Sequence, residues 1–138
     1  MKKSILLFVA LALAACHTKP QKSDLSKLNG YWEIEKVVLP DGHEKTYKIN
    51  ETIDFFQLKG TKGFRKKVSP QFDGRYLVND QQENITLLET NGAFFLQYDT
   101  PYGKWKEQLL DISSDELVLQ NEQKLEYHYK KPQPFTLK

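Results

Sequence analysis

The sequence predicts an all-β fold, an up-and-down antiparallel barrel of eight or nine strands, and three observations point to it. Short apolar runs alternate with turn residues along most of the chain. The turns are too short to hold crossover helices, so neighbouring strands are expected to pair antiparallel. A sheet of this many strands tends to curl, and closing it removes its exposed edges.

The first strand is expected around Trp32, with Trp32, Ile34 and Val38 on one face and Glu33 and Glu35 on the other. The other strands are expected at residues 52–58, 64–68, 75–78, 85–88, 94–98, 105–112, 117–119 and 125–129. The turns between them are expected at Pro40-Asp41-Gly42, Gly60 to Gly63, Asp73-Gly74, Asn79-Asp80, Asn91-Gly92, Pro101 to Gly103 and Ser113-Ser114-Asp115.

Two segments have helical features. Trp105, Leu109 and Ile112 fit helical spacing as well as a strand, but the segment is short and lies between hairpins, so a strand is predicted. One short helical turn is expected from Asp24 to Leu28, with Ser23 or Asp24 as its cap.

The N-terminus carries the pattern of a signal peptide. Lys2 and Lys3 precede an apolar run from Ile5 to Ala15, which is too short to cross a hydrocarbon layer about 30 Å thick. The run ends in Leu13-Ala14-Ala15-Cys16, which resembles the lipobox of bacterial lipoproteins. This resemblance implies that residues 1–15 are removed and that Cys16 is acylated. The alternative is an ordinary secretory signal followed by a chance cysteine.

The domain boundaries and the compartment follow from this assignment. We expect a lipidated tether at 16–23, the barrel at 24–131 and a C-terminal tail at 132–138. Acyl chains on Cys16 would attach the protein to a membrane of the cell envelope. Because His17 follows the cysteine in place of aspartate, the outer membrane is expected rather than the inner one.

Composition then limits the partners. Removing residues 1–15 takes Lys2 and Lys3 away, so the formal charge falls from +2 to zero and gives no argument for nucleic-acid binding. Since Cys16 is the chain's one cysteine, no disulfide can form within a chain. We expect a monomer.

The opening of the barrel carries a family resemblance. Residues 25–32 form a short apolar turn followed by Gly30-Tyr31-Trp32, which resembles the Gly-x-Trp opening of the lipocalins. Residues 53–56, 72–76 and 115–119 resemble the lipocalin-like lipoproteins of the Bacteroidetes. Gly30 would allow close packing at the barrel floor, and Trp32 would plug that end. Lipocalins cover this tryptophan with an arginine on the last strand, where this chain has Lys130 and Lys131.

The resemblance implies a barrel that binds or carries a small hydrophobic ligand. Strand parity selects Phe55 and Tyr98 as wall residues, although a slip of one residue would turn either side chain outward. The alternative is a structural or protein-interaction lipoprotein whose barrel is filled by its own side chains.

Catalysis and metal binding are not expected. His17, His43 and His128 lack the spacing of metal ligands, and no nucleophile motif or phosphate loop is present. The sequence therefore predicts neither an enzyme nor a bound cofactor.

One basic run remains as a candidate partner surface. Its five cations are Lys59, Lys62, Arg65, Lys66 and Lys67. They would meet anionic head groups near the membrane, and the alternative is a solvated hairpin.

Overall fold

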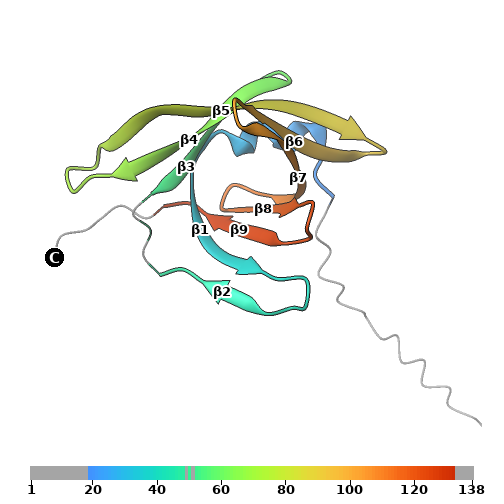
Figure 1. The fold of residues 1–138 in the computed structure, drawn as a ribbon, viewed down its shortest axis with the longest axis horizontal. Coiled ribbons are helices and arrows are strands. Elements are labelled where there is room, and N and C mark those ends of the chain that lie inside the picture. Colours follow the sequence, from blue (N-terminus) through green and yellow to red (C-terminus); the bar gives the residue numbers. More distant parts are fainter. Residues whose placement is uncertain (1–18, 49, 51, 133–138) are drawn as a thin grey trace, which may run out of the picture.

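Each strand of the barrel pairs antiparallel with the next one in the sheet, and the first strand closes on the last (Figure 1). The computed structural model describes residues 19–48, 50 and 52–132. The elements are a 3-10 helix η1 (Lys22–Leu28) and the strands β1 (Gly30–Val38), β2 (Glu44–Thr46), β3 (Ile53–Lys59), β4 (Lys62–Pro70), β5 (Tyr76–Thr90), β6 (Ala93–Thr100), β7 (Gly103–Ile112), β8 (Glu116–Asn121) and β9 (Glu126–Lys130).

Pairing between β1 and β9 closes the sheet. Ile34 lies opposite Tyr129, and Val37 lies opposite Tyr127. Strands β1 and β3 to β9 therefore form an eight-stranded antiparallel barrel, and β2 adds a short ribbon to the edge of β1 beyond β3. The predicted all-β barrel is confirmed.

The turn predicted at Asn79-Asp80 is wrong, because β5 runs without interruption through both residues. A shift in register absorbs the extra length. Lys66 pairs with Gln82, whereas Val68 pairs with Val78, so β5 contributes more residues than β4 across this bulge. The two short strands expected at 75–78 and 85–88 are parts of one long strand.

Strand β1 also contains a bulge, and the sequence gives no sign of it. The register shifts between Ile34 and Lys36, which turns Val37 toward the interior. Val37 is accordingly buried. Val38, which was predicted to share a face with Trp32, lies on the opposite face of the strand. Strand β2 was not predicted either, because its three residues are all exposed and show no apolar alternation.

The remaining helical alternatives are settled by backbone pairing. Residues 103–112 form β7, so the helical interpretation of this segment is wrong. Helix η1 begins at Lys22, inside the segment expected to be a tether. Neither Ser23 nor Asp24 is its N-cap; Gln21 holds that position, and its backbone N–H donates to the Asp24 carboxylate at 2.9 Å. No helix in the described part of the chain is long and apolar enough to cross a membrane.

Helix η1 closes one end of the barrel, and Trp32 is the centre of that end. Its side chain is fully buried, and its indole Nε1 donates a hydrogen bond of 2.8 Å to the carbonyl of Leu28. The ammonium of Lys131 lies 3.8 Å from the centre of the Trp32 ring, so a lysine covers this ring where lipocalins would place an arginine. Gly30 has a φ of +123°, and a Cβ there would lie 3.2 Å from the Lys131 ammonium.

The predictions for the two termini concern mainly residues that the structure does not describe. The predicted signal peptide at 1–15, Cys16 and His17 all precede Lys19, the first described residue. Of the predicted tail at 132–138, the structure describes residue 132 alone.

Candidate functional site

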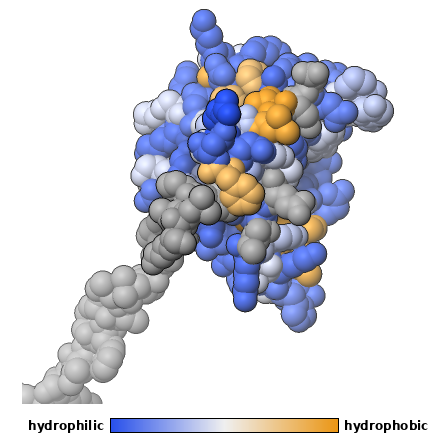
Figure 2. Space-filling view, turned by 90° about the vertical axis from the view of Figure 1, so that its left-hand side faces the viewer, coloured by the Kyte–Doolittle hydropathy of each residue, from blue (hydrophilic) through white to orange (hydrophobic). Residues whose placement is uncertain are grey.

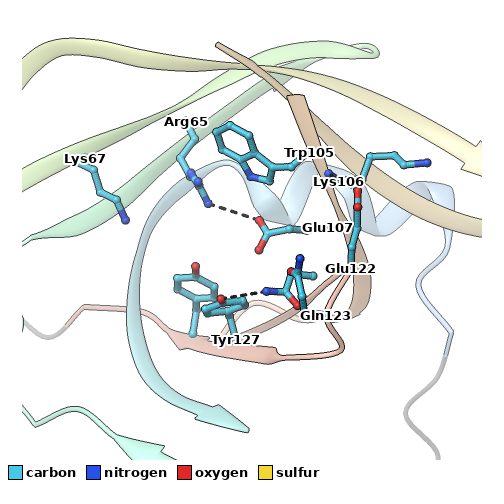
Figure 3. Close-up of a pocket in the computed structure, with 10 residues that line it drawn as sticks. Arg65, Lys67, Trp105, Lys106, Glu107, Glu122, Gln123 and Tyr127 are labelled. Carbon is cyan, nitrogen blue, oxygen red and sulfur yellow. Dashed lines mark hydrogen bonds and ion pairs between the residues drawn. The ribbon is translucent and has the colours of Figure 1, made fainter. Parts of the chain in front are cut away.

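The barrel opens at the end opposite η1, where the turns after β4, β6 and β8 lie. Two pockets meet at this mouth and share Arg65, Lys67 and Trp105. The first, here called the aromatic pocket, has a volume of about 320 Å³ (Figure 3). Its other lining residues are Lys106, Glu107, Asn121, Glu122, Gln123, Tyr127 and Tyr129. The second, here called the side pocket, has a volume of about 620 Å³ and lies against β5 and the β6–β7 turn.

Arg65 is the charged centre of the mouth. It points inward from β4, and its side chain is only 11% exposed. Its Nε and Nη2 donate to the two carboxylate oxygens of Glu83 at 2.8 and 2.9 Å, which is the bidentate geometry that suits an arginine and a carboxylate. Burial disfavours the guanidinium charge, but Tyr98, Asp54 and Glu83 outweigh this effect and raise the pKa of Arg65. The guanidinium is therefore a fixed positive charge.

Glu107 faces Arg65 from β7 and is less well satisfied. Its Oε1 lies 3.5 Å from Nη1 of Arg65, and this oxygen atom makes no hydrogen bond within the described residues. Burial raises the pKa of the Glu107 carboxyl, while Arg65 and the hydroxyl of Tyr98 act in the opposite direction. The mouth thus contains a buried carboxyl group with unused hydrogen-bonding capacity.

A second ion pair lies beside the first. The ammonium of Lys67 is 2.6 Å from Oδ1 of Asp54, whose residue is only 4% exposed. The register places Asp54 opposite Lys67 and Phe56 opposite Arg65, so β4 carries both cations and β3 supplies the carboxylate of Asp54. Arg65 and Lys67 therefore each have a carboxylate partner of their own.

Tyr98 and Trp105 form the aromatic part of the mouth. Their rings stack with centres 5.4 Å apart, and the Arg65 guanidinium lies 4.3 Å from the centre of the Tyr98 ring. Tyr98 is fully buried, and burial raises the pKa of its hydroxyl. Trp105 is half-buried and lines both pockets, so it presents an apolar surface to anything bound in the mouth.

The two predicted wall residues have different positions. Tyr98 lies inside the barrel, beneath Arg65 and Trp105. Phe55 lies on the outer face, where its ring is 4.8 Å from Tyr31 and 6.1 Å from Phe64. Its neighbour Phe56 occupies the interior instead. The structure thus places Phe55 outside the barrel, because two consecutive phenylalanines leave the parity of this strand open.

The basic run does not form one surface. Lys59 and Lys62 are exposed beside the β3–β4 turn at the closed end, whereas Arg65 and Lys67 line the mouth. Lys66 lies on the outer face, with its ammonium 5.4 Å from the ring centre of Phe64. Lys59 at the end of β3 and the four cations of β4 therefore lie in three different parts of the molecule.

Sequence reasoning missed the acidic partners of the mouth. Asp54 shares its parity with Phe56, and Glu107 shares its parity with Leu109, so both carboxyl groups lie on otherwise apolar faces of their strands. An acidic residue on the otherwise apolar face of a strand was the feature of the sequence that could have indicated them. In the part of the chain that the structure describes, no group of three or more His, Cys, Asp or Glu side chains is placed to hold a metal ion.

Comparison with known proteins gives similarity at the level of solved structures. No family model and no curated protein matches the chain. A lipocalin-like protein from Bacteroides uniformis is 13% identical with a TM-score of 0.48, and the match covers 76% of this chain and 98% of that one. Apocrustacyanin C2 is 12% identical with a TM-score of 0.48, covering 81% of this chain and 64% of that one. An uncharacterized protein from Bacteroides eggerthii is 11% identical with a TM-score of 0.47, covering 76% and 99%.

Proposed function

We propose that this chain is a lipid-anchored envelope protein that binds a small amphipathic molecule in the mouth of its barrel, without catalysing a reaction. The observation that carries the proposal is the pair of pockets that meet at Arg65, Lys67 and Trp105. Both lie in an eight-stranded barrel whose opposite end is filled by Trp32 and its neighbours. Barrels of this size hold at most one small ligand.

The ligand is amphipathic rather than purely apolar, because the mouth has two kinds of lining. Trp105 offers an apolar surface, and burying apolar area against it contributes about 25 cal/mol per Å². Arg65, Lys67 and Glu107 lie beside it and would lose hydration beneath a purely hydrocarbon ligand. A ligand with an apolar body and a polar group satisfies both parts of the lining.

The test is binding of an uncharged, environment-sensitive amphipathic dye such as Nile red to the purified chain. We expect saturable binding at micromolar concentration that is weakened by Trp105→Ala. Phe55→Ala is the matched control, because it removes an aromatic ring from the outer face and leaves the mouth intact. Absence of saturable binding by the wild-type chain, or equal loss in both variants, contradicts binding in the mouth.

The proposed anchor is the acylated Cys16, with the outer membrane as its location. Three peptide units separate Cys16 from Lys19 and span at most about 11 Å. Lys19 lies against Gly92 in the β5–β6 turn, which belongs to the closed end. The closed end, with Lys59 and Lys62, would then face the anionic head groups, and the mouth would face away from the membrane.

Metabolic labelling tests the anchor. In a host that processes lipoproteins, labelled palmitate should appear on the wild-type chain and not on Cys16→Ala. Fractionation of the labelled cells then checks the outer membrane. An unlabelled wild-type chain would mean that no acyl anchor is attached.

A second candidate function is favoured by one hairpin. Three apolar residues at the projecting β4–β5 hairpin are exposed, namely Phe72 (79%), Leu77 (66%) and Val78 (50%). Apolar side chains gather among polar ones on this face of the molecule (Figure 2). Because Leu77 and Val78 are consecutive in β5, apolar area is exposed on both faces of the hairpin. Exposed apolar area is typical of protein-interaction sites and favours an interaction lipoprotein. Crosslinking in intact cells that is lost in Leu77→Lys, with dye binding unchanged, would support this alternative.

A further inference from the structure

The aromatic pocket combines three aromatic rings with two carboxyl groups. Trp105, Tyr127 and Tyr129 supply the rings, and Glu107 and Glu122 supply the carboxyl groups. In Figure 3, Trp105 and Glu107 from β7 and Tyr127 from β9 approach the same space. Aromatic faces and carboxylates both attract cations, so the electrostatic balance of this pocket decides what it binds.

Two of the cations near the pocket are already paired with carboxylates outside this set. Arg65 makes its two short hydrogen bonds to Glu83, and Lys67 lies 2.6 Å from Asp54. Each pair is close to neutral as a unit. Neither cation therefore supplies an unpaired positive charge to the pocket.

The third cation is directed away from the pocket. The ammonium of Lys106 lies 5.7 Å from the ring centre of Phe95. Figure 3 shows the same side chain extending away from Glu107 and Tyr127. Lys106 therefore contributes its backbone to the rim, where its N–H donates to Oε1 of Glu122 at 3.2 Å.

The two carboxyl groups of the pocket, Glu107 and Glu122, are less closely paired with cations than Glu83 and Asp54 are. The Glu107 side chain is only 7% exposed, and among the described residues its one cationic contact is the 3.5 Å approach to Nη1 of Arg65. Its Oε1 makes no hydrogen bond in the described structure. Glu122 is exposed at the rim and makes no ion pair with a described residue. The unbalanced charge of the pocket is thus negative.

We propose that the aromatic pocket binds a small organic cation, an amine whose ammonium donates to Glu107 while its apolar body packs against Trp105 and Tyr127. This inference rests on the proposed function and specifies the ligand class of the same site. The volume of about 320 Å³ suits a single-ring amine. An anion of the same shape would meet Glu107 and Glu122, and a neutral molecule would lose the charge-assisted hydrogen bond.

The experiment compares three probes of one shape and different charge. The full chain in nonionic detergent is titrated calorimetrically with 2-phenylethylamine, 2-phenylethanol and 3-phenylpropionate. We expect the amine to bind about tenfold more tightly than the alcohol, with the acid weaker still. Tighter binding of the acid or the alcohol overturns the cation inference.

Two variants test whether Glu107 is the carboxylate that binds the ammonium. Glu107→Gln keeps the shape of the side chain and should reduce amine affinity about tenfold, leaving the alcohol unchanged. Glu126→Gln is the matched control, because Glu126 lies 3.4 Å from His128 and lines neither pocket of the mouth. An equal loss in both variants, or none in Glu107→Gln, overturns the role of Glu107.

The pH profile adds a readout that a structural role would not change. Ionised Glu107 binds the ammonium better than the protonated form, so amine affinity should rise as the pH rises through the raised pKa of Glu107. The groups that face it are Asp54, Arg65, Glu83, Tyr98 and Tyr129, from five other strands. The part of the rise that disappears in Glu107→Gln belongs to Glu107, and an unchanged profile contradicts the proposal.

The outcomes separate this inference from the proposed function. If the uncharged dye binds in a Trp105-dependent manner and the amine does not bind, the mouth is a ligand site and the cation class is wrong. If neither the dye nor the amine binds, both proposals are wrong.

Discussion

At the closed end of the barrel, Trp32 is covered by η1 and Lys131, and its neighbours are apolar and fully buried. At the mouth, Arg65 and Glu107 are also buried, but they are charged and surrounded by pockets. The first arrangement gains stability from packing and from removing apolar surface from water. The second pays a desolvation cost that ion pairing only offsets.

The difference indicates which end is shaped by folding and which by another requirement. A well-packed apolar cluster at the mouth would stabilise the barrel at least as well as two ion pairs. Charged groups at this position are therefore explained better by ligand binding than by stability. The predictions below test this division of roles, from the largest expected effect to the smallest.

Replacing Trp32 should give the largest loss of stability. Trp32→Ala removes a fully buried ring and its hydrogen bond to Leu28, and should lower the free energy of unfolding by about 3–5 kcal/mol. Urea denaturation followed by far-UV circular dichroism measures the loss. Trp105→Ala is the control, because Trp105 is half-buried and should lose less than half as much. Equal losses would contradict the contrast between the two ends.

Breaking the main ion pair should have a smaller effect. Glu83→Ala leaves Arg65 buried without its bidentate partner, and should cost about 2 kcal/mol because Glu83 is itself partly exposed. Replacing both residues together, as Arg65→Met with Glu83→Ala, should cost less than Glu83→Ala alone. Urea midpoints of the three variants test this order. A double variant less stable than Glu83→Ala would show that the pair is a net source of stability.

The sequence predicts the regular parts of this barrel and misses its irregularities. Alternation and turn residues locate β3, β6 and β7, and Asn91-Gly92 has the two positive φ angles of a tight hairpin turn. The bulges in β1 and β5 are set by tertiary closure, so Val37 and Asn79-Asp80 could not be placed from local pattern.

The candidate site was predictable only in part for the same reason. Parity placed Tyr98 inside, but the adjacent Phe55 and Phe56 could exchange roles with a slip of one residue. The pairing of Arg65 with Glu83 joins residues on neighbouring strands, and it depends on the β4–β5 register. That register contains a bulge, so a single sequence did not reveal the pair.

Removing the cover of Trp32 should have a modest effect. Lys131→Met keeps much of the aliphatic chain but removes the ammonium that lies 3.8 Å from the ring centre, and should cost about 0.5–1 kcal/mol. The matched control is Lys130→Met, because Lys130 makes no ring contact within the described residues. Urea midpoints measure both variants. A loss in Lys130→Met as large as in Lys131→Met would show that the aromatic contact contributes nothing.

The smallest expected effect is a change in the pH dependence of stability, and Glu107 is its source. Because burial raises the pKa of Glu107 in the folded state, the unfolded chain releases this proton at lower pH than the folded chain does. As the pH rises from about 4 toward neutrality, this residue should therefore lower the free energy of unfolding until the folded carboxyl has also ionised. Glu107→Gln has no proton to release and should lack that decline.

The exposed carboxyl groups of Asp41 and Asp73, whose pKa values are lowered by His43 and Arg75, act in the opposite direction but are present in both chains. Subtracting the urea midpoints of the variant from those of the wild type across this pH range isolates the contribution of Glu107. Parallel curves would mean that Glu107 is no more costly to ionise in the mouth than in water. The charged mouth would then have lost its clearest sign of a function other than stability.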